Sequence, residues 1–360
     1  MKPVKIGKYE IKYPIIQGGM GVGISWDGLA GNVSLEGGLG VLSAVGTGYY
    51  KDKEFSKKLV QGRPVDAMEF NSRDAMIQMI KDTRKISGDK PLGVNVMCAL
   101  NDYDRIVKDC CDGGVDIIIS GAGLPVTLPD LTKDYPDVAL VPIVSSARAL
   151  KLICKKWKRY GKTPDAIVVE GPLSGGHQGF GYDDCFKDEF QLENITPPII
   201  EEAKKWGDIP VFVAGGIWDK NDIDKYIDMC CAGVQMATRF IGTVECDAHE
   251  NLKKVLLECK EEDIKLLKSP VGYPARGIKT QLLDDIENDV APKISCISNC
   301  ISPCNRGEEA KQVKLCVADR LADAYHGKVD SGLFFTGTNG YRLNEIITVK
   351  ELMKKLVEGE

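Results

Sequence analysis

The sequence predicts an α/β fold built as one (β/α)8 TIM barrel, and three observations support this prediction. Eight short apolar runs recur before residue 240, most of them are followed by an amphipathic helical pattern, and no second cluster of strand-like runs interrupts the alternation. Short apolar runs rich in β-branched residues are typical of parallel strands buried on both faces. Their alternation with helices predicts βα units, and eight in succession favour a closed barrel over an open sheet.

Each apolar run is expected to form one strand. In chain order these are Pro14–Gln17, Gly40–Ser43, Leu92–Met97, Asp116–Ser120, Ala139–Val144, Ala166–Glu170, Pro210–Ala214 and Gly233–Met236. Helical patterns between them include Asp102–Gly113, Ala147–Tyr160, Pro197–Trp206 and Asn221–Ala232. A barrel carries its active site on the loops that follow its strands, so the residues at these strand ends are the candidates for chemistry.

Two segments exceed a minimal barrel. The barrel is expected to span residues 1–245, with an insertion at about 46–90 between its second and third strands. Residues 246–360 are expected to form a helical C-terminal extension packed on the barrel, with a cysteine-rich patch at 296–316. Segments beside strand ends are natural walls for a substrate site.

Composition excludes several classes of function. The 360 residues carry a formal net charge of −5, so a broad nucleic-acid-binding surface is not expected. The chain opens without an apolar signal segment, and no apolar run approaches the roughly 18 residues that a membrane helix needs. Thirteen cysteines without an export signal indicate a reducing compartment, and we therefore expect a cytoplasmic protein.

Glycines follow the seventh predicted strand, and a polar segment follows the eighth. Gly215 and Gly216 let backbone N–H groups approach an anion closely, and the helix start predicted near Asp219 adds a favourable dipole. A tight turn would also use two glycines. In barrels, however, the loops after strands seven and eight form the usual phosphate site, which favours phosphate binding here. The residues expected to contribute after strand eight are Gln235, Met236, Ala237 and Thr238.

A glycine-rich loop after strand one and an amide at the end of strand three suit a flat heterocycle. Gly19 and Met20 lie in Gln17–Gly21, where a backbone with few side chains can lie against a ring and offer N–H donors. The spacing is not that of a dinucleotide-binding fingerprint. The Asn95 amide both donates and accepts, which matches alternating carbonyl and N–H groups such as those of the flavin pyrimidine edge.

The loop after strand six, EGPLSGGHQG from Glu170, is the most informative stretch. It places His177 between glycines at a strand's C-terminal end, where a side chain points into the barrel mouth. An imidazole there can act as acid, base or hydrogen-bond donor. The other two histidines, His249 and His326, fall on or near predicted helices and are expected to be structural.

Together these motifs resemble those of a known family. The segments PIIQGGMG, GVNVM, EGPLSGGHQGF, VAGGI and GVQMATRF are similar to the nitronate monooxygenase (formerly 2-nitropropane dioxygenase) family, which includes flavin-dependent enoyl-ACP reductases. The similarity covers roughly residues 10–280. It implies FMN as the cofactor and His177 as the active-site histidine. The implied FMN contacts are Gly19, Met20, Asn95, Glu170, Gly175, Gly176, Gly215, Gly216, Gln235, Met236, Ala237 and Thr238.

Two positions depart from the family pattern. Family members commonly carry Gln where this chain has Glu170, and a carboxylate near the flavin disfavours its anionic reduced form unless the carboxylate is protonated or paired. Ala237 replaces the glycine of the usual QMGT motif but keeps the backbone N–H, so the contact is retained.

The resemblance leaves the reaction open. The first interpretation is oxidation of alkyl nitronates with O2, with His177 as the acid or base over the flavin. The alternative is reduction of an enoyl thioester with hydride from NAD(P)H. A third is a flavin-binding sensor or assembly protein, which His177 argues against because binding alone needs no titratable group. Both enzyme interpretations imply a small-molecule substrate, and a homodimer is compatible with the sequence.

The cysteine-rich patch has the spacing C-x3-C-x3-C-x11-C. It resembles the iron–sulfur pattern of 2,4-dienoyl-CoA reductase-type barrels, whose first spacer is one residue shorter. A cluster or zinc is chemically feasible, but we favour reduced thiols and predict no metal site. The four cysteines are Cys296, Cys300, Cys304 and Cys316.

Substrate-contacting residues are harder to predict. Candidates to line the barrel mouth are Tyr49, Tyr50, Tyr273 and Arg276. The glycine-rich segment Gly337–Tyr341 either reaches the flavin site or forms a simple turn, and we expect the turn.

Overall fold

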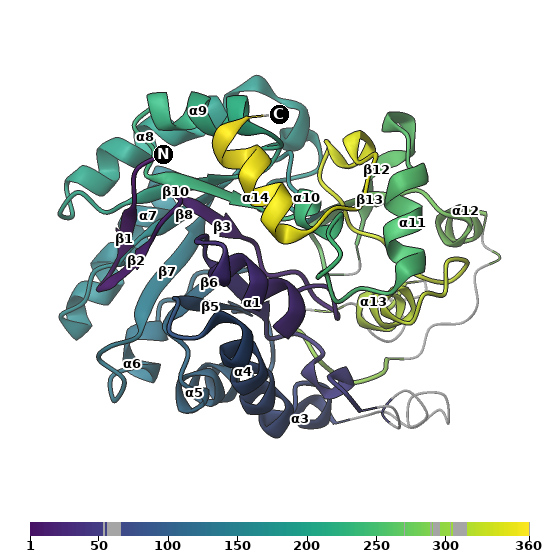
Figure 1. Ribbon diagram of the computed structural model, residues 1–360, viewed down its shortest axis with the longest axis horizontal. Coiled ribbons are helices and arrows are strands. Elements are labelled where there is room, and N and C mark those ends of the chain that lie inside the picture. The colour runs from purple at the N-terminus through teal and green to yellow at the C-terminus, as the bar shows by residue number, and fades with distance from the viewer. Residues whose placement is uncertain are drawn as a thin grey trace.

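An eight-stranded parallel sheet, nearly closed into a barrel, forms the centre of the computed structural model (Figure 1). The structure describes residues 1–52, 55, 66–269, 271–288, 290, 296–302, 304 and 315–359. The strand order is β3-β11-β10-β8-β7-β6-β5-β4, and a parallel bridge between Ile16 and Leu39 brings the first and last of these together. This arrangement confirms the predicted TIM barrel.

All eight predicted strands are present, with ends shifted by one residue at most. They are β3 (Ile15–Gln17), β4 (Gly40–Ser43), β5 (Leu92–Met97), β6 (Ile117–Gly121), β7 (Ala139–Val144), β8 (Ile167–Glu170), β10 (Val211–Ala214) and β11 (Gly233–Met236). Their apolar side chains are buried on both faces, as the β-branched runs predict.

Helices on the outside connect the strands. They are α1 (Asp27–Leu35), α3 (Ala67–Phe70), α4 (Arg73–Ser87), α5 (Tyr103–Gly113), α6 (Leu128–Leu131), α7 (Ala147–Trp157), α8 (Leu192–Lys204), α9 (Lys220–Asp228) and α10 (Thr238–Ile241). Short 3-10 turns are η1 (Thr47–Tyr49), η2 (Lys158–Tyr160), η3 (Asp183–Phe186) and η4 (Asp188–Phe190).

Two of these helices differ from the sequence prediction. Helix α8 begins five residues earlier than expected, because Pro197 and Pro198 lie inside it rather than at its start. Helix α9 ends at Asp228 instead of Ala232, since Cys230 adopts a left-handed φ of 67° that a continuing helix does not allow.

An antiparallel hairpin, β1 (Val4–Ile6) with β2 (Tyr9–Ile11), closes the end of the barrel at which the strands begin. It lies at the left of Figure 1. Ile6 and Ile11 of the hairpin are fully or almost fully buried. They share one apolar cluster with the inward-facing residues of the barrel, which include Ile16, Leu39, Val41, Ile117, Ile119, Val141, Val168 and Phe212. The barrel interior is therefore a packed core, and the open end lies opposite the hairpin.

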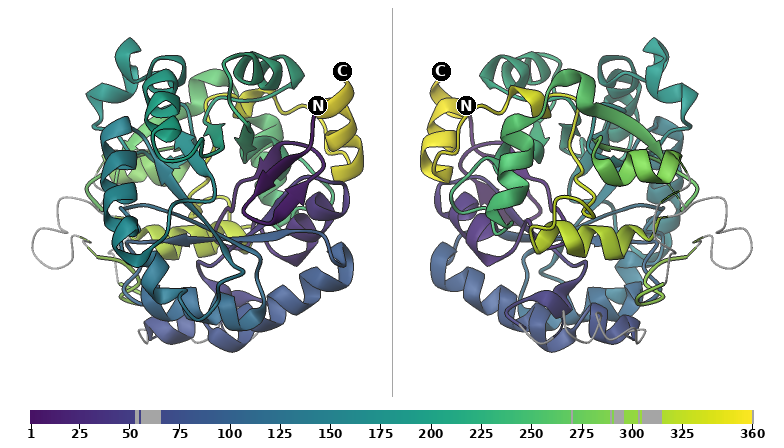
Figure 2. Two further views of the ribbon diagram at one scale, coloured as in Figure 1. Left: turned by 90° about the vertical axis from the view of Figure 1, so that its left-hand side faces the viewer. Right: turned by 90° about the vertical axis from the view of Figure 1, so that its right-hand side faces the viewer.

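The C-terminal extension gathers at that open end, in front of the barrel in the right-hand view of Figure 2. It contains α11 (Glu250–Glu258), η5 (Glu261–Asp263), β12 (Ile264–Lys268), β13 (Pro274–Ile278), α12 (Gln281–Glu287), α13 (Val317–Tyr325), η7 (Gly340–Arg342) and α14 (Val349–Glu358). Strands β12 and β13 were not predicted. They form a three-stranded sheet with β9 (Gly176–His177), a piece of the loop after β8.

The last helix returns to the barrel. Helix α14 packs between α1 and α9, so it completes the outer ring of helices. Its first turn is held by a capping box, in which Thr348 and Glu351 each accept the other's backbone N–H.

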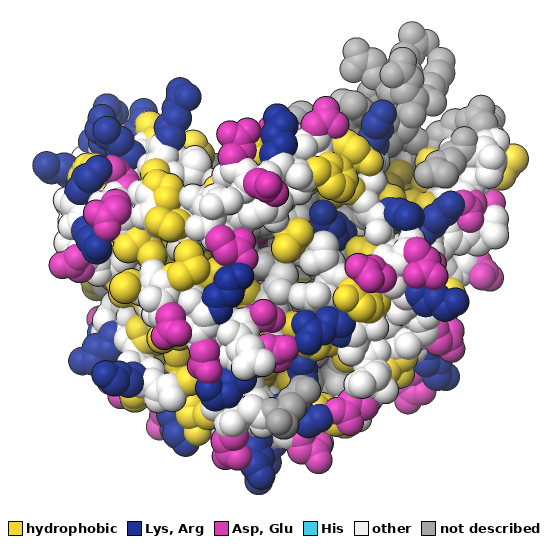
Figure 3. Space-filling view, turned by 90° about the horizontal axis from the view of Figure 1, so that it is seen from above, with side chains coloured by type: hydrophobic (Ala, Val, Ile, Leu, Met, Phe, Trp, Pro, Cys, Tyr) yellow, Lys and Arg dark blue, Asp and Glu magenta, His cyan; other side chains and the backbone are white. Residues whose placement is uncertain are grey.

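Acidic and basic side chains are intermingled over much of the face shown in Figure 3. None of the helices in the described part of the chain is both long and apolar enough to cross a membrane.

Candidate active site

A cavity of about 1690 Å³ opens where the barrel strands end, and the extension forms part of its wall. Every residue that the sequence analysis placed at the FMN or catalytic site lies on this wall. These are Gly19, Met20, Asn95, Glu170, Gly175, Gly176, His177, Gly215, Gly216, Gln235, Met236, Ala237 and Thr238. The fold therefore brings them together from the ends of five barrel strands, β3, β5, β8, β10 and β11.

The glycines after β10 form one end of the cavity. Gly215 and Gly216 have φ values of 102° and 79°, which L-residues rarely adopt. A Cβ at Gly215 would lie 2.9 Å from the carbonyl oxygen of Gly171, so the chain is too closely packed there for a side chain. The backbone around these two residues is thus exposed to the cavity, as a phosphate cradle requires.

The residues after β11 complete this end. Thr238 begins α10, and its Oγ1 accepts the N–H of Gly337 at 2.9 Å, which leaves the hydroxyl hydrogen free to donate. The Asn339 Nδ2 donates to the carbonyl of Gly216 at 2.7 Å. The segment Gly337–Tyr341 contains the 3-10 turn η7, but its first residues also reach the cavity, so the expectation of a simple turn was wrong.

The glycine-rich loop after β3 packs directly against β5 on the cavity wall. Met20 N–H donates to the Ser25 hydroxyl at 3.0 Å, and the Gln17 side-chain amide donates to the same oxygen at 2.9 Å. A Cβ at Gly19 would lie only 2.6 Å from the Cβ of Asn95. Only glycine allows this close approach, which places the loop backbone beside the Asn95 amide.

Glu170 and Gln235 lie at one level of the barrel, because both are in register with Ala214 between them. The Gln235 Oε1 is buried without a hydrogen-bond partner in the described structure. Burial raises the pKa of Glu170 to about 7, against 4.5 in water. Two polar groups thus face the cavity with unused hydrogen-bonding capacity, which a polar ligand would satisfy.

His177 is held by strand pairing rather than by the loop alone. In β9 it pairs with Ala275 of β13, and its Nε2 lies 2.7 Å from the Oγ of Ser269. The ring of Phe335 packs edge-on against the imidazole, with 5.5 Å between centroids. Desolvation lowers the pKa of His177 to about 4, so the ring is neutral at neutral pH.

Two buried polar side chains hold the loop between β8 and β9. The Arg276 guanidinium donates to the carbonyl oxygens of Pro172 and Ser174, the latter at 3.0 Å. The Gln178 Nε2 donates to the carbonyls of Ser174 and Gly176, both at 2.9 Å. These contacts fix the backbone that presents His177 to the cavity.

Comparison with known proteins shows the family to which this chain belongs. The profile of the family described as "Nitronate monooxygenase" matches residues 2–359, nearly the whole chain. The chain belongs to the nitronate monooxygenase family. A protein named probable nitronate monooxygenase from Staphylococcus aureus (strain JH9) is 26% identical over an alignment of 299 positions, which covers 77% of this chain and 78% of the relative.

Solved structures share the fold of this chain. FabK from Thermotoga maritima superimposes with a TM-score of 0.73 and 25% identity, over 97% of this chain and 93% of FabK. A nitroalkane oxidase from Streptomyces ansochromogenes shares the fold, with a TM-score of 0.70 and 21% identity over 97% and 96% of the two chains. The protein is thus an FMN-dependent oxidoreductase, as the resemblance implied, and not a non-catalytic binding protein.

The cavity of this nitronate monooxygenase family member fits FMN. The glycines at 215 and 216, whose positive φ values suit glycine, and the Thr238 hydroxyl suit its phosphate. The close approach of Gly19 to Asn95 leaves a flat wall for its ring. The unpartnered Gln235 Oε1 suits an N–H of the ring.

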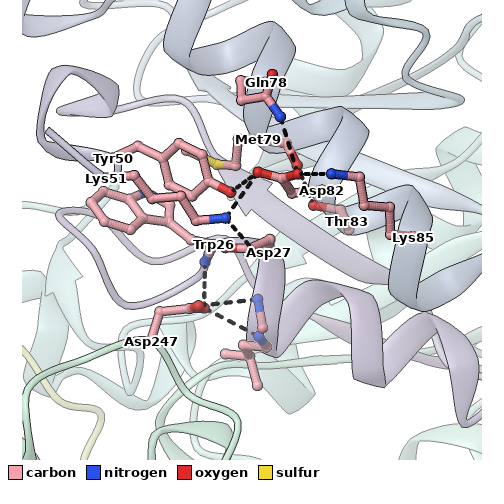
Figure 4. A network of polar contacts seen from close by, with 12 residues as sticks. Trp26, Asp27, Tyr50, Lys51, Gln78, Met79, Asp82, Thr83, Lys85 and Asp247 are labelled. Carbon is pink, nitrogen blue, oxygen red and sulfur yellow. Dashed lines mark hydrogen bonds and ion pairs between the residues drawn. The ribbon is translucent and has the colours of Figure 1, made fainter.

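The candidates for the barrel mouth divide into two groups. Tyr273 lines the cavity, whereas Arg276 holds the loop behind it. Tyr49 and Tyr50 are buried in the apolar core, so the expectation that they line the mouth was wrong. Figure 4 shows the Tyr50 hydroxyl donating to Asp82, at 2.8 Å.

The four cysteines of the patch all lie on the cavity wall, and none of them forms a disulfide in the described structure. Burial raises the pKa of Cys300 to about 11 and also raises that of Cys316. Within the described residues, no three His, Cys, Asp or Glu side chains converge closely enough to hold a metal ion.

The two histidines other than His177 lie at helix ends. His249 accepts the N–H of Asn251, and His326 follows α13.

Sequence reasoning missed Ser269, and it expected Gly337 and Asn339 to belong to a simple turn. Ser269 lies 92 positions from His177, and Asn339 lies 123 positions from Gly216. No local pattern marks Ser269 as a site residue, since only the pairing of β9 with β13 brings it to His177. The return of the extension brings Gly337 and Asn339 to the cavity.

Proposed function

We propose that the protein oxidises alkyl nitronates with O2 at FMN bound in the cavity. The observation that carries this proposal is the neutral imidazole of His177 on the cavity wall, in a chain that belongs to the nitronate monooxygenase family. FMN, when bound, supplies the two-electron oxidation and the reaction of reduced flavin with oxygen. The protein supplies orientation and charge stabilisation.

His177 could act as a base toward a nitroalkane or as a hydrogen-bond donor to a nitronate, and its low pKa favours the second role. An imidazole with a pKa of about 4 holds an abstracted proton weakly, so His177 is a poor base toward a neutral nitroalkane. As a neutral ring it still donates one N–H. Its Nε2 is engaged with Ser269, and within the described structure Nδ1 has no protein partner. We infer that His177 donates this hydrogen bond to a nitronate oxygen, which supports a substrate that arrives already ionised.

A second candidate is the reduction of an enoyl thioester with NAD(P)H. The size of the cavity favours it, because about 1690 Å³ exceeds the 300–1,000 Å³ of common small-ligand pockets. The wall contributed by the extension is also largely apolar, as an acyl chain requires. These residues include Val271, Ile297, Ile301, Leu315, Val317, Leu321 and Phe335.

The test compares two reactions of the purified yellow protein. We expect oxygen uptake with alkyl nitronates, and we expect His177→Ala to lower kcat/KM by about 10²–10³-fold, the range for loss of one charge-stabilising donor. His249→Asn is the matched control, because Asn retains the capping role at α11 outside the cavity. NAD(P)H-dependent reduction of an enoyl thioester without nitronate-dependent oxygen uptake would contradict the proposal and support the second candidate.

A further inference from the structure

Glu170 occupies an unusual position for a carboxyl group. It is the last residue of β8, lies on the wall of the flavin cavity, and is in register with Ala214 and thereby with Gln235. Among the residues that the structure describes, it is the only Asp or Glu on that wall. It has no hydrogen-bond partner there, and desolvation alone raises its pKa.

Among the described elements that pack around Glu170, none supplies a compensating charge. The strands on either side, β7 and β10, carry no titratable residue. Helix α8 covers β8 on the outside and carries Glu193, Glu201, Glu202 and Lys204, which are engaged in ion pairs at the outer surface. The nearby Arg276 guanidinium donates to loop carbonyls and lies outside the described cavity lining.

The other titratable groups that face the cavity differ from Glu170. His177 has a pKa of about 4, and burial raises the pKa of the thiols of Cys98, Cys300 and Cys316. These four groups are therefore uncharged near pH 7. The remaining ones come from the extension and are Tyr273, Cys296 and Cys304. Glu170 is the group on this wall whose own pKa, about 7, falls in the neutral range.

We propose that Glu170 exchanges a proton with solvent in step with the oxidation state of the bound flavin. When FMN gains two electrons and one proton, its ring system carries an added negative charge. A like charge nearby favours the protonated carboxyl, so Glu170 takes up a second proton from solvent and releases it when the flavin is reoxidised. The electrons come from the substrate in turnover. This inference rests on FMN occupying the cavity and not on the identity of the substrate.

The test follows the midpoint potential of bound FMN against pH, with electrons from dithionite or xanthine oxidase and a reference dye. In the wild-type holoenzyme we expect two protons per two electrons between pH 7 and the higher pKa that Glu170 has beside reduced flavin, which doubles the slope expected for one proton. Above that window the slope should return to one proton. We expect Glu170→Gln to keep the one-proton slope throughout. Glu201→Gln, an exposed carboxyl on α8, is the matched control and should keep the wild-type profile.

A second measurement covers the case in which Glu170→Gln does not fold. Anaerobic reduction of the wild-type holoenzyme in unbuffered solution with a pH indicator counts the protons directly, and we expect close to two per flavin just above pH 7. A count of one, or equal slopes for wild type and Glu170→Gln, would overturn the inference while leaving nitronate oxidation intact. Failure of the protein to bind FMN would instead overturn the proposed function.

Discussion

At the scale of single residues, Ser269 sets the orientation of the active-site imidazole. Its Oγ lies 2.7 Å from His177 Nε2, and Val271 N–H donates to the same oxygen at 3.5 Å. We infer that this hydroxyl, which accepts from Val271, donates to Nε2 and so leaves the imidazole proton on Nδ1. Ser269 is therefore a positioning residue, one step removed from the substrate.

We predict that Ser269→Ala lowers kcat/KM with nitronate several-fold, because a neutral hydrogen bond contributes about 1 kcal/mol. Ser269→Thr keeps the hydroxyl and should restore most of the activity. The acid limb of the pH profile separates positioning from general damage, since loss of the partner should move the apparent pKa of His177 from about 4. Equal activity of the Ala and wild-type proteins, with the same acid limb, would show that Ser269 does not position the ring.

At the scale of elements, Asp247 connects the extension to α1, the helix that follows the glycine-rich loop. Its carboxylate accepts the N–H groups of Trp26, Gly28 and Leu29 at 2.8, 3.0 and 3.1 Å (Figure 4). A carboxylate at a helix N-terminus satisfies donors that have no partner within the helix. One side chain from beyond β11 thus fixes the start of α1.

We predict that Asp247→Asn destabilises the protein by about 1–2 kcal/mol, since an amide replaces one accepting oxygen with a donor. Asp27→Asn in the same first turn is the control, because the Asp27 side chain lies 3.4 Å from the exposed Lys51 and does not accept the N–H groups that Asp247 caps. Asp27→Asn should lower the free energy of unfolding by less than about 0.5 kcal/mol. The measurement is urea unfolding of both variants. Equal losses would show that capping by Asp247 is not what stabilises α1.

The sequence predicts the strands and helices that short-range residue patterns determine. The eight barrel strands were predicted to within one residue, because their apolar β-branched runs are buried on both faces. Strands β12 and β13 were missed, because IKLLK and PARGI have no such pattern and exist by pairing with each other and with β9. Likewise, the glycines at the strand ends predicted where the cavity lies. The positions of Ser269 and Asn339 at the site depend instead on contacts between residues about 100 positions apart in the chain.

At the scale of the whole molecule, barrel and extension share the cavity. The barrel contributes the strand ends, and the extension contributes Val271 and Tyr273 before β13, the residues around Phe335 and the segment that reaches Thr238. A ligand in the cavity therefore touches both parts, and its binding energy adds to the stability of the fold.

We predict that FMN at 100 times its dissociation constant adds about 2.7 kcal/mol to the stability of the apoprotein and raises Tm by a few degrees. Riboflavin, which lacks the phosphate, should raise Tm less at equal concentration, because the backbone at Gly215 and Gly216 has no anion to bind. The measurement is a thermal scan with each ligand. Equal shifts would contradict the assignment of the phosphate to this loop.

The most direct test of the central claim is a single turnover without oxygen. The yellow holoenzyme is mixed anaerobically with an alkyl nitronate, and the visible absorbance of the flavin is followed before and after air is admitted. We predict that the nitronate bleaches the flavin and that oxygen restores its colour. A flavin that stays yellow with every nitronate, yet is bleached at once by NADH or NADPH, would contradict nitronate oxidation as the function of this site.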